Sequence, residues 1–403
     1  MWRLLLLLSI PQIALLHGTG EQGVSCDDWE PMDIESFEEL ECCFEDLTRS
    51  QQCLDIAMHA LGETHDVKEM LREFTAAREK HKPIETNCHV IAHAIGRTSF
   101  QKTGNLGEAF HACDMSCHAG CYHGVLESLF FTEEQRAKGI EHLEFEQIAE
   151  KIPTVCTEQL LGKDKSVVAQ CQHGLGHAIL YTIDYDLPNA LRGCDLLPTR
   201  YARESCYIGV FTENVIAEDK EKRNLKEDDV FYPCNAIDRK YQQMCYKDHT
   251  KVLIHRGMTD QEVAEACAGL PEFKEECFEG LGRDISTDFR EGGRERAQKA
   301  CEESSEGFEA SCIAGHVYAL LDNTGDGSFG FRFCESLKDP KNQQTCFRLS
   351  MHYLATLHEK NRQALLEMCT VTESGRTLCE REAKRATAGT LELIWILLSD
   401  LWL

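Results

Sequence analysis

The sequence predicts an all-α fold: a solenoid-like array of helical hairpins, each stapled by a disulfide. Three observations support this prediction. Cysteines recur in close pairs at a nearly constant period, apolar residues between the pairs are spaced by three and four, and strand-like alternation is scarce. The chain holds 22 cysteines in 403 residues, none spaced as Cys-x-x-Cys, which favours a disulfide framework over zinc knuckles.

Residues 1–20 are predicted to form a secretory signal peptide. Arg3 supplies the positive flank, residues 4–16 are mostly apolar, and Gly18 and Gly20 are small residues suited to a cleavage site. We therefore expect a secreted, extracellular protein, in which paired cysteines are oxidised.

Residues 21–150 are predicted to form a helical region that is rich in cysteine and histidine. Its eight cysteines are spaced too irregularly for their connectivity to be assigned from sequence. Cys113, Cys117 and Cys121 are spaced by four and would share a helix face. We expect them to be disulfide partners, two locally and one with Cys88; the alternative is that one of them is a metal ligand.

Residues 151–386 are predicted to be helical-hairpin repeats with local disulfides. The first cysteines of successive pairs lie about 33 to 40 residues apart, which is the length of one helical hairpin. Each repeat would run helix, cysteine, short loop, cysteine, helix. The expected disulfides are Cys156/Cys171, Cys194/Cys206, Cys234/Cys245, Cys267/Cys277, Cys301/Cys312, Cys334/Cys346 and Cys369/Cys379.

Two stretches between the pairs carry helical periodicity, residues 131–152 and 258–270. In the second, Thr259 can cap the helix, with Glu262 three positions on. A glycine within a helix costs about 1 kcal/mol relative to alanine, so a recurring one predicts close approach of helices. Such a glycine recurs three positions after the second cysteine, at Gly124, Gly174, Gly209, Gly280 and Gly315.

Residues 387–403 form an apolar tail. The tail is short for a membrane span and carries Glu392 and Asp400. We expect a helix packed on the last repeat; the alternatives are an interfacial helix or a cleaved anchor signal. Membrane contact is expected only through this tail. The net charge of −26 makes nucleic acid and anionic membranes poor partners for the rest of the chain.

Three pairs of histidine or glutamate at positions i and i+4 mark the first half of the chain. Residues so spaced lie one turn apart on one helix face and can bind the same ion. Imidazole and carboxylate ligands suit iron, copper, manganese or zinc. The expected metal ligands are His89 and His93, His123 and Glu127, and His173 and His177.

The repeats provide an internal control for this pattern. His123 and His173 lie two positions after the second cysteine of a pair, and Glu127 and His177 lie six positions after it. In later repeats, the only histidine at either position is His352. The hairpin fold itself therefore does not require histidine there.

The first pair fits less regularly. His89 and His93 match the same frame if Cys88 is displaced by one position. Because successive repeats stack in register, we expect all three helix faces to converge on one site. Arg97 and Tyr181 each follow the last histidine of a pair by four residues. They are further candidates to orient a bound oxygen or substrate, although an ordinary surface or core position would also accommodate them.

The pattern points to metal-dependent catalysis, oxidative or hydrolytic, in a secreted helical repeat protein. The alternative is a non-catalytic extracellular scaffold that binds a metal, a cofactor or a protein. The expected partner is a small molecule or an extracellular protein. A zinc metalloprotease motif needs glutamate directly after the first histidine, where this chain has Val90, Gly124 and Gly174.

Overall fold

The computed structural model describes residues 26, 29–44, 50–114, 116–131, 135, 138, 140, 142–162, 165–217, 220–286, 293–324, 327–358 and 360–389. The predicted signal peptide and the apolar tail beyond residue 389 lie outside the described residues. The described part is built of helices and loops without a strand, which confirms the predicted all-helical class. None of its helices is both long and apolar enough to span a membrane.

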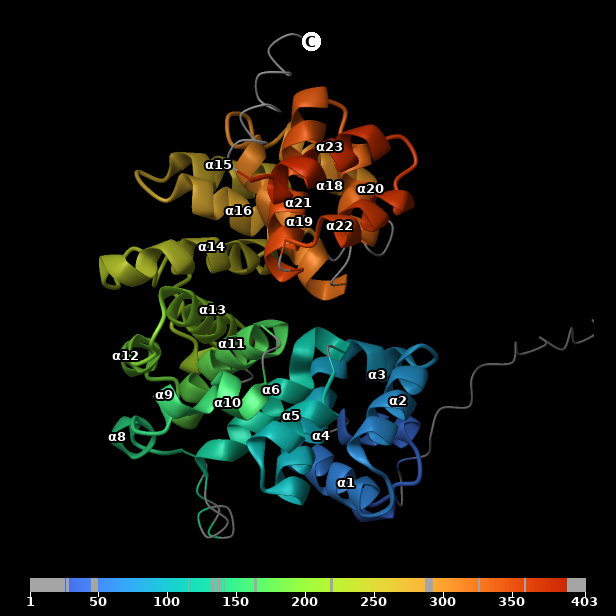
Figure 1. Cartoon of the computed structure of the whole chain (residues 1–403). Helices are drawn as coiled ribbons and strands as arrows, with labels where there is room; N and C mark the ends of the chain where they lie inside the picture. The colour runs from blue at the N-terminus through green and yellow to red at the C-terminus, as the bar shows by residue number, and fades with distance from the viewer. Residues whose placement is uncertain are drawn as a thin grey trace, which may run out of the picture.

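The first half of the chain begins with short 3-10 helices. It continues as the α-helices drawn in blue and green in Figure 1. Its elements are η1 (Pro31–Asp33), η2 (Phe37–Phe44), α1 (Ser50–Thr64), α2 (Val67–Arg78), α3 (Lys82–Thr86), α4 (Cys88–Thr103), α5 (Leu106–Ala112), α6 (Ser116–Phe130), α8 (Phe145–Ile148), α9 (Ile152–Val155), α10 (Glu158–Leu161), α11 (Lys165–Thr182), α12 (Leu187–Asp195) and α13 (Arg200–Ile216).

The second half alternates shorter and longer helices. Its elements are η3 (Lys220–Lys222), α14 (Arg239–His255), α15 (Asp260–Gly269), α16 (Lys274–Asp284), α18 (Arg294–Glu302), α19 (Glu309–Thr324), α20 (Ser328–Ser336), α21 (Pro340–Leu357), α22 (Arg362–Met368), η4 (Cys369–Val371) and α23 (Arg376–Thr387).

Every predicted local disulfide is present, from Cys156–Cys171 to Cys369–Cys379. They close loops of 10 to 15 residues, and each stabilises by about 3 kcal/mol in the chain-entropy model. The expectation for the three closely spaced cysteines is also confirmed. The disulfides of the cysteine-rich region are Cys26–Cys42, Cys43–Cys53, Cys88–Cys117 and Cys113–Cys121.

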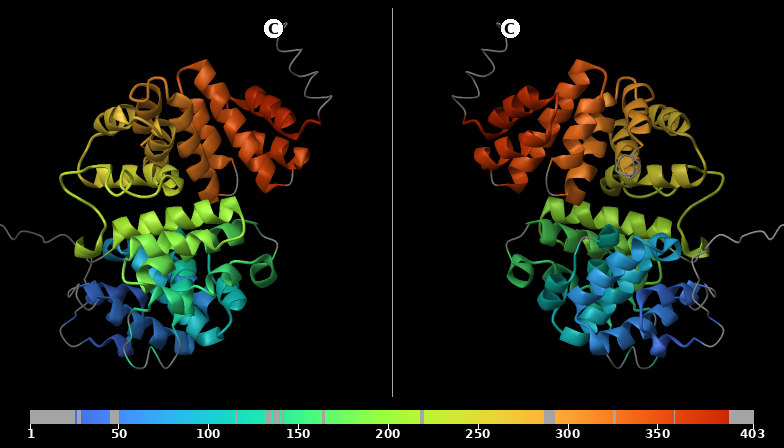
Figure 2. Two further views of the ribbon diagram at one scale, coloured as in Figure 1. Left: turned by 90° about the vertical axis from the view of Figure 1, so that its left-hand side faces the viewer. Right: turned by 90° about the vertical axis from the view of Figure 1, so that its right-hand side faces the viewer.

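Starting from α4, each helix that contains the second cysteine of a disulfide packs on the helix before it in this series. These contacts run through α4, α6, α11, α13, α14, α16, α19, α21 and α23. Figure 2 shows the same progression, from the N-terminal half at the base to the C-terminal half at the top. Equivalent positions of consecutive repeats therefore lie side by side on neighbouring helices of this series.

Glycine makes this packing close, as the sequence predicts. A Cβ atom added to Gly124 would lie 1.9 Å from the carbonyl oxygen of His93, and one added to Gly209 would lie 2.0 Å from that of His173. No side chain fits at such distances, so α6 lies directly against α4, and α13 directly against α11.

Of the two helices predicted from the local sequence, one is confirmed and the other is wrong. Thr259 and Glu262 form the expected capping box at the start of α15. The helix predicted over residues 131–152 is wrong, because residues 142–144 are not helical. The Leu143 N–H donates to the carbonyl of Thr182, and a second capping box at Glu144 begins the short helix α8.

Candidate metal centre

Three neighbouring helices direct five histidines into one cluster. α4 carries His89 and His93, α6 carries His123, and α11 carries His173 and His177. The ring centroid of His123 lies 5.4 and 5.3 Å from those of His89 and His93, and 5.7 and 4.4 Å from those of His173 and His177. His123 is therefore the centre of the cluster.

The five imidazoles form two overlapping triads that share His123. The ligand atoms of His89, His93 and His123 lie within 4.8 Å of one another, as do those of His123, His173 and His177. The structure thus brings together the five histidines expected from sequence.

The register of the first pair differs from the expectation. Gly124 packs on the carbonyl of His93 in the way that Gly209 packs on the carbonyl of His173. His93, rather than His89, is therefore the counterpart of His173, and His89 lies one turn earlier. The one-position displacement assumed from Cys88 is wrong, because Cys88 does not form a local staple but bonds to Cys117.

The outer nitrogens of the first pair are held by acceptors. His93 Nδ1 lies 2.6 Å from Glu127 Oε1, and His89 Nδ1 lies 2.8 Å from the carbonyl oxygen of Cys117. A carboxylate or carbonyl on the far nitrogen fixes the tautomer and orientation of a metal-binding imidazole. Both rings then direct Nε2 inward, and the two Nε2 atoms are 3.0 Å apart.

The second pair repeats this arrangement with different partners. His177 Nδ1 lies 2.9 Å from Glu213 Oε2, and its Nε2 lies 3.1 Å from His173 Nε2. The backbone of Ser205 lies near the His173 imidazole and raises its pKa against the effect of burial. Tyr185 donates its hydroxyl to the other oxygen of Glu213. Each pair therefore has a carboxylate behind its second histidine and a backbone group behind its first.

The hydrogen-bond partners of the first pair determine which ring nitrogens carry protons. The carbonyl of Cys117 and the carboxylate of Glu127 only accept, so Nδ1 of His89 and of His93 must carry the proton. In the neutral rings both Nε2 atoms then hold lone pairs, and these face each other at 3.0 Å. A metal ion placed between these two nitrogens would be bound by both lone pairs.

His123 is buried and unsatisfied. Only 2% of the residue is exposed, and neither ring nitrogen has a hydrogen-bond partner among the described residues. Burial lowers the pKa of His123 well below its usual value, and the four neighbouring histidines lower that pKa further. A neutral imidazole with unpaired buried nitrogens is costly unless a ligand satisfies it.

Glu127 lies behind the histidines instead of beside His123. Its second carboxylate oxygen accepts from Arg97 Nη1 at 2.7 Å, and Arg97 Nε donates to Asp55. Burial would raise the pKa of Glu127, but His93 and Arg97 outweigh burial and lower that pKa to about 2. The carboxylate is therefore ionised and engaged with both of its neighbours.

Tyr181 lies at the end of the same face of α11. Its hydroxyl accepts a hydrogen bond from Gln51 Nε2 at 3.0 Å, so α1 meets α11 across 130 residues of sequence. Burial raises the pKa of Tyr181, and Glu127 raises it further. Tyr181 and Arg97, the two further candidates from sequence, thus both have partners on α1.

Sequence reasoning missed Glu213. The predicted ligands lie two and six positions after the second cysteine of a pair. This repeat has Ile208 and Thr212 at those positions, whereas Glu213 lies seven positions after Cys206. Only 7% of Glu213 is exposed. A glutamate within the largely apolar end of α13 was the available signal, because an unpaired carboxylate is rarely buried.

A charged network continues the row beyond His173. Buried Asp248 Oδ1 lies 2.8 Å from Lys251 Nζ and 2.8 Å from Arg283 Nη1. Lys251 also donates to Thr212. Burial lowers the pKa of His173 to about 4, with Lys251 as the next cause, so this imidazole is held neutral.

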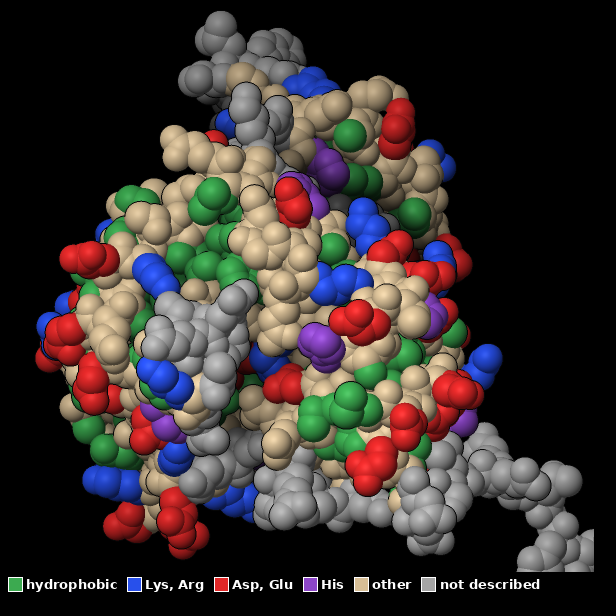
Figure 3. All heavy atoms as spheres, turned by 90° about the horizontal axis from the view of Figure 1, so that it is seen from below, with side chains coloured by type: hydrophobic (Ala, Val, Ile, Leu, Met, Phe, Trp, Pro, Cys, Tyr) green, Lys and Arg blue, Asp and Glu red, His purple; other side chains and the backbone are tan. Residues whose placement is uncertain are grey.

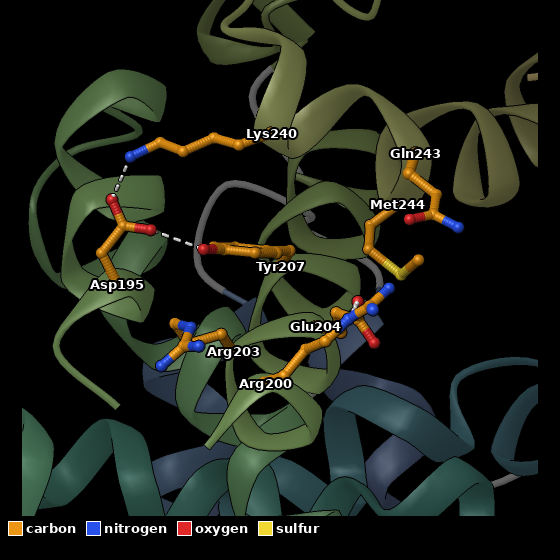
Figure 4. A pocket seen from close by; sticks show the side chains of 8 residues that line it. All are labelled: Asp195, Arg200, Arg203, Glu204, Tyr207, Lys240, Gln243 and Met244. Carbon is orange, nitrogen blue, oxygen red and sulfur yellow. Dashed lines mark hydrogen bonds and ion pairs between the residues drawn. The ribbon is translucent and has the colours of Figure 1, made fainter. Parts of the chain in front are cut away.

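Two other sites carry less chemistry. Cys234 and Cys245 lie near His249, but they form a disulfide, and His249 Nε2 bonds to the carbonyl of Val230. A hollow of about 330 Å³ lies between α13 and α14 (Figure 4). Its charges are paired within the chain, with Lys240 and Tyr207 both bound to Asp195.

The face seen from below carries interspersed acidic and basic side chains instead of one continuous basic patch (Figure 3). The described chain is thus a disulfide-stapled helical protein with a buried histidine cluster. Comparison with protein-family models, curated proteins and solved structures finds no match.

Proposed function

We propose that this protein binds a transition metal in the histidine cluster of α4, α6 and α11. The observation that carries the proposal is buried His123, whose two ring nitrogens have no partner among the described residues and which lies between two inward-facing Nε2 pairs. A buried imidazole of this kind needs a ligand on its lone pair. A metal ion satisfies His123 and the facing lone pairs together.

The spacing of the nitrogens suits one ion per pair. Two imidazole nitrogens bound to one ion at about 2.0 to 2.1 Å, with an angle of about 90° to 110°, lie about 2.9 to 3.4 Å apart. The Nε2 atoms are 3.0 Å apart in the first pair and 3.1 Å apart in the second.

The proposed ligands are five of the six residues expected from sequence. Glu127 is proposed to orient His93, as Glu213 orients His177, because its oxygens already bond His93 and Arg97. The remaining donors are all imidazoles. Such a set favours zinc or copper over manganese, which prefers oxygen ligands, and over iron sites that include a carboxylate.

Metal-dependent catalysis remains the leading function. An ion held by three histidines keeps a coordination position open and supplies Lewis acidity to a water or substrate there. His89 and His173 are only partly buried, which supports access for a small molecule. Arg97 is proposed to act through Glu127, not directly on a substrate. A saturated coordination shell would instead favour a scaffold that stores a metal or binds a partner.

We also propose that the site lies in an extracellular protein built as a solenoid-like array of helices. Local disulfides throughout the chain support an oxidising, extracellular compartment. The helices from α6 to α23 that contain the second cysteines contact one another in chain order, which supports a solenoid-like array. The site would join the predicted region 21–150, which holds three of the histidines, to the repeats of 151–386, which hold two.

Elemental analysis of the purified secreted protein tests the function. We expect zinc or copper at one or two ions per chain, reduced in the double variant His173→Ala/His177→Ala, with helicity and disulfides unchanged. His249→Gln is the matched control, because His249 is also a buried helical histidine but lies outside the cluster. Full metal content in the double variant would refute the site.

A further inference from the structure

We infer that the cluster holds two divalent ions, bridged by the imidazole of His123. This inference rests on the proposed metal function and adds the number of ions and the role of His123. His89, His93 and His123 would bind the first ion. His123, His173 and His177 would bind the second.

The division into triads supports two ions. Ligand atoms bound to one ion at about 2.0 to 2.1 Å can be at most about 4.2 Å apart. Within each triad the atoms already lie within 4.8 Å, so small side-chain rotations are sufficient. Among the described residues, the five histidines do not form one group of this size, and the two pairs meet through His123.

His123 lies between the two histidine pairs, where a bridge between two ions would have to lie. Its two nitrogens are buried without a partner in the described part of the chain. Its ring is nearly perpendicular to those of His89 and His93, at 79° and 84°, and stacks on His177 at 21°. Binding an ion together with His177 therefore requires the His123 ring to turn about its Cβ–Cγ bond, a broad torsion.

Bridging changes the proton count. A neutral imidazole has one protonated nitrogen and one lone pair. Coordination of both nitrogens of His123 therefore releases its ring proton to solvent when the second ion binds. The resulting imidazolate charge lies between two cations, and Glu127 and Glu213 supply further negative charge behind His93 and His177. Two ions are thus better compensated here than in a cluster of neutral imidazoles alone.

Copper is a direct probe of the bridge. The metal-free full chain is titrated with Cu²⁺, and bound copper is compared with the intensity of the electron paramagnetic resonance signal. We expect two Cu²⁺ per chain and a signal well below the bound copper, because an imidazolate couples two neighbouring spins. His123→Leu should abolish this coupling and weaken binding at both sites.

Two double variants separate the sites. His89→Ala/His93→Ala and His173→Ala/His177→Ala should each retain one Cu²⁺ with a full, uncoupled signal. His249→Gln should behave as wild type, and circular dichroism checks that each variant is folded.

The outcomes distinguish this inference from the proposed function. One Cu²⁺ in the wild type, lost in both double variants, would overturn the two-ion inference and leave metal binding intact. Two uncoupled ions in the wild type would overturn the bridge. No bound copper or zinc would overturn the proposed function itself.

Discussion

Gly124→Ala tests whether close helix packing builds the site. The added Cβ would lie 1.9 Å from the carbonyl oxygen of His93 and 2.9 Å from its Cα. These are backbone atoms, so no side-chain rotation relieves the clash. To reach the roughly 3 Å that real contacts allow, α6 must move away from α4 by about 1 Å.

Two opposing contributions determine how much Gly124→Ala changes the free energy of unfolding. Overpacking costs about 1 to 3 kcal/mol or more, and a backbone clash belongs at the upper end of that range. Alanine regains about 1 kcal/mol of helix propensity. We expect the free energy of unfolding to fall by about 1 to 2 kcal/mol. The effect on metal is larger, because a shift of about 1 Å exceeds the roughly 0.2 Å tolerance of metal–ligand bonds.

The assay combines urea unfolding of the metal-free protein with copper titration. Gly269→Ala is the matched control, since Gly269 ends α15 and a Cβ there would meet nothing within 4 Å. This control should be as stable as the wild type, or more stable by up to about 1 kcal/mol, with unchanged copper binding. If Gly124→Ala matches the control in both measurements, the contact between α4 and α6 does not position His93 and His123.

Three further outcomes are expected. Replacing Cys88 and Cys117 with serine removes the cross-link between α4 and α6, so the free energy of unfolding should fall by about 3 to 4 kcal/mol and copper binding should weaken. The Cys369/Cys379 double variant should affect stability alone. Glu213→Gln removes the charge behind His177, so metal affinity in a chelator competition should fall about 10- to 100-fold; an unchanged affinity would contradict the orienting role. Burial lowers the pKa of His173 to about 4 in the folded protein, whereas the pKa of an imidazole in the unfolded chain is about 6.5. As the pH falls, the unfolded state therefore takes up a proton before the folded state does. The metal-free protein should therefore lose stability as the pH falls from about 6.5 towards 4, and a flat profile in urea titrations would refute this.

The staples were predictable because they are local. Each pair beyond residue 150 closes a loop of at most 15 residues, and a constant period left little choice of partner. The convergence of the histidines followed from the same periodicity, because His123 and His173 occupy equivalent positions of packed helices. The pairing of Cys26, Cys42, Cys43 and Cys53 lay in the irregular region and could not be assigned before the helices were placed.

The partners of the histidines could not be read from the sequence. Glu213 is one position away from the repeat frame, and helix rotation alone decides that it reaches His177. Gln51 meets Tyr181 across 130 residues, a contact between α1 and α11 that no local spacing specifies. The offset of His93 likewise depends on where Gly124 packs, which no spacing of cysteines specifies.

The same repeat position carries different chemistry along the series of packed helices. Six positions after the cysteine, α11 has His177, α14 has Lys251 and α16 has Arg283. The last two share the carboxylate of Asp248, so that stretch of the row is satisfied by ion pairs within the protein. At His123 the row instead has two ring nitrogens that no group of the described chain satisfies. Because the fold accommodates a self-neutralising network at equivalent positions, packing alone does not account for the histidines, and the unsatisfied nitrogens of His123 support the proposed metal ion.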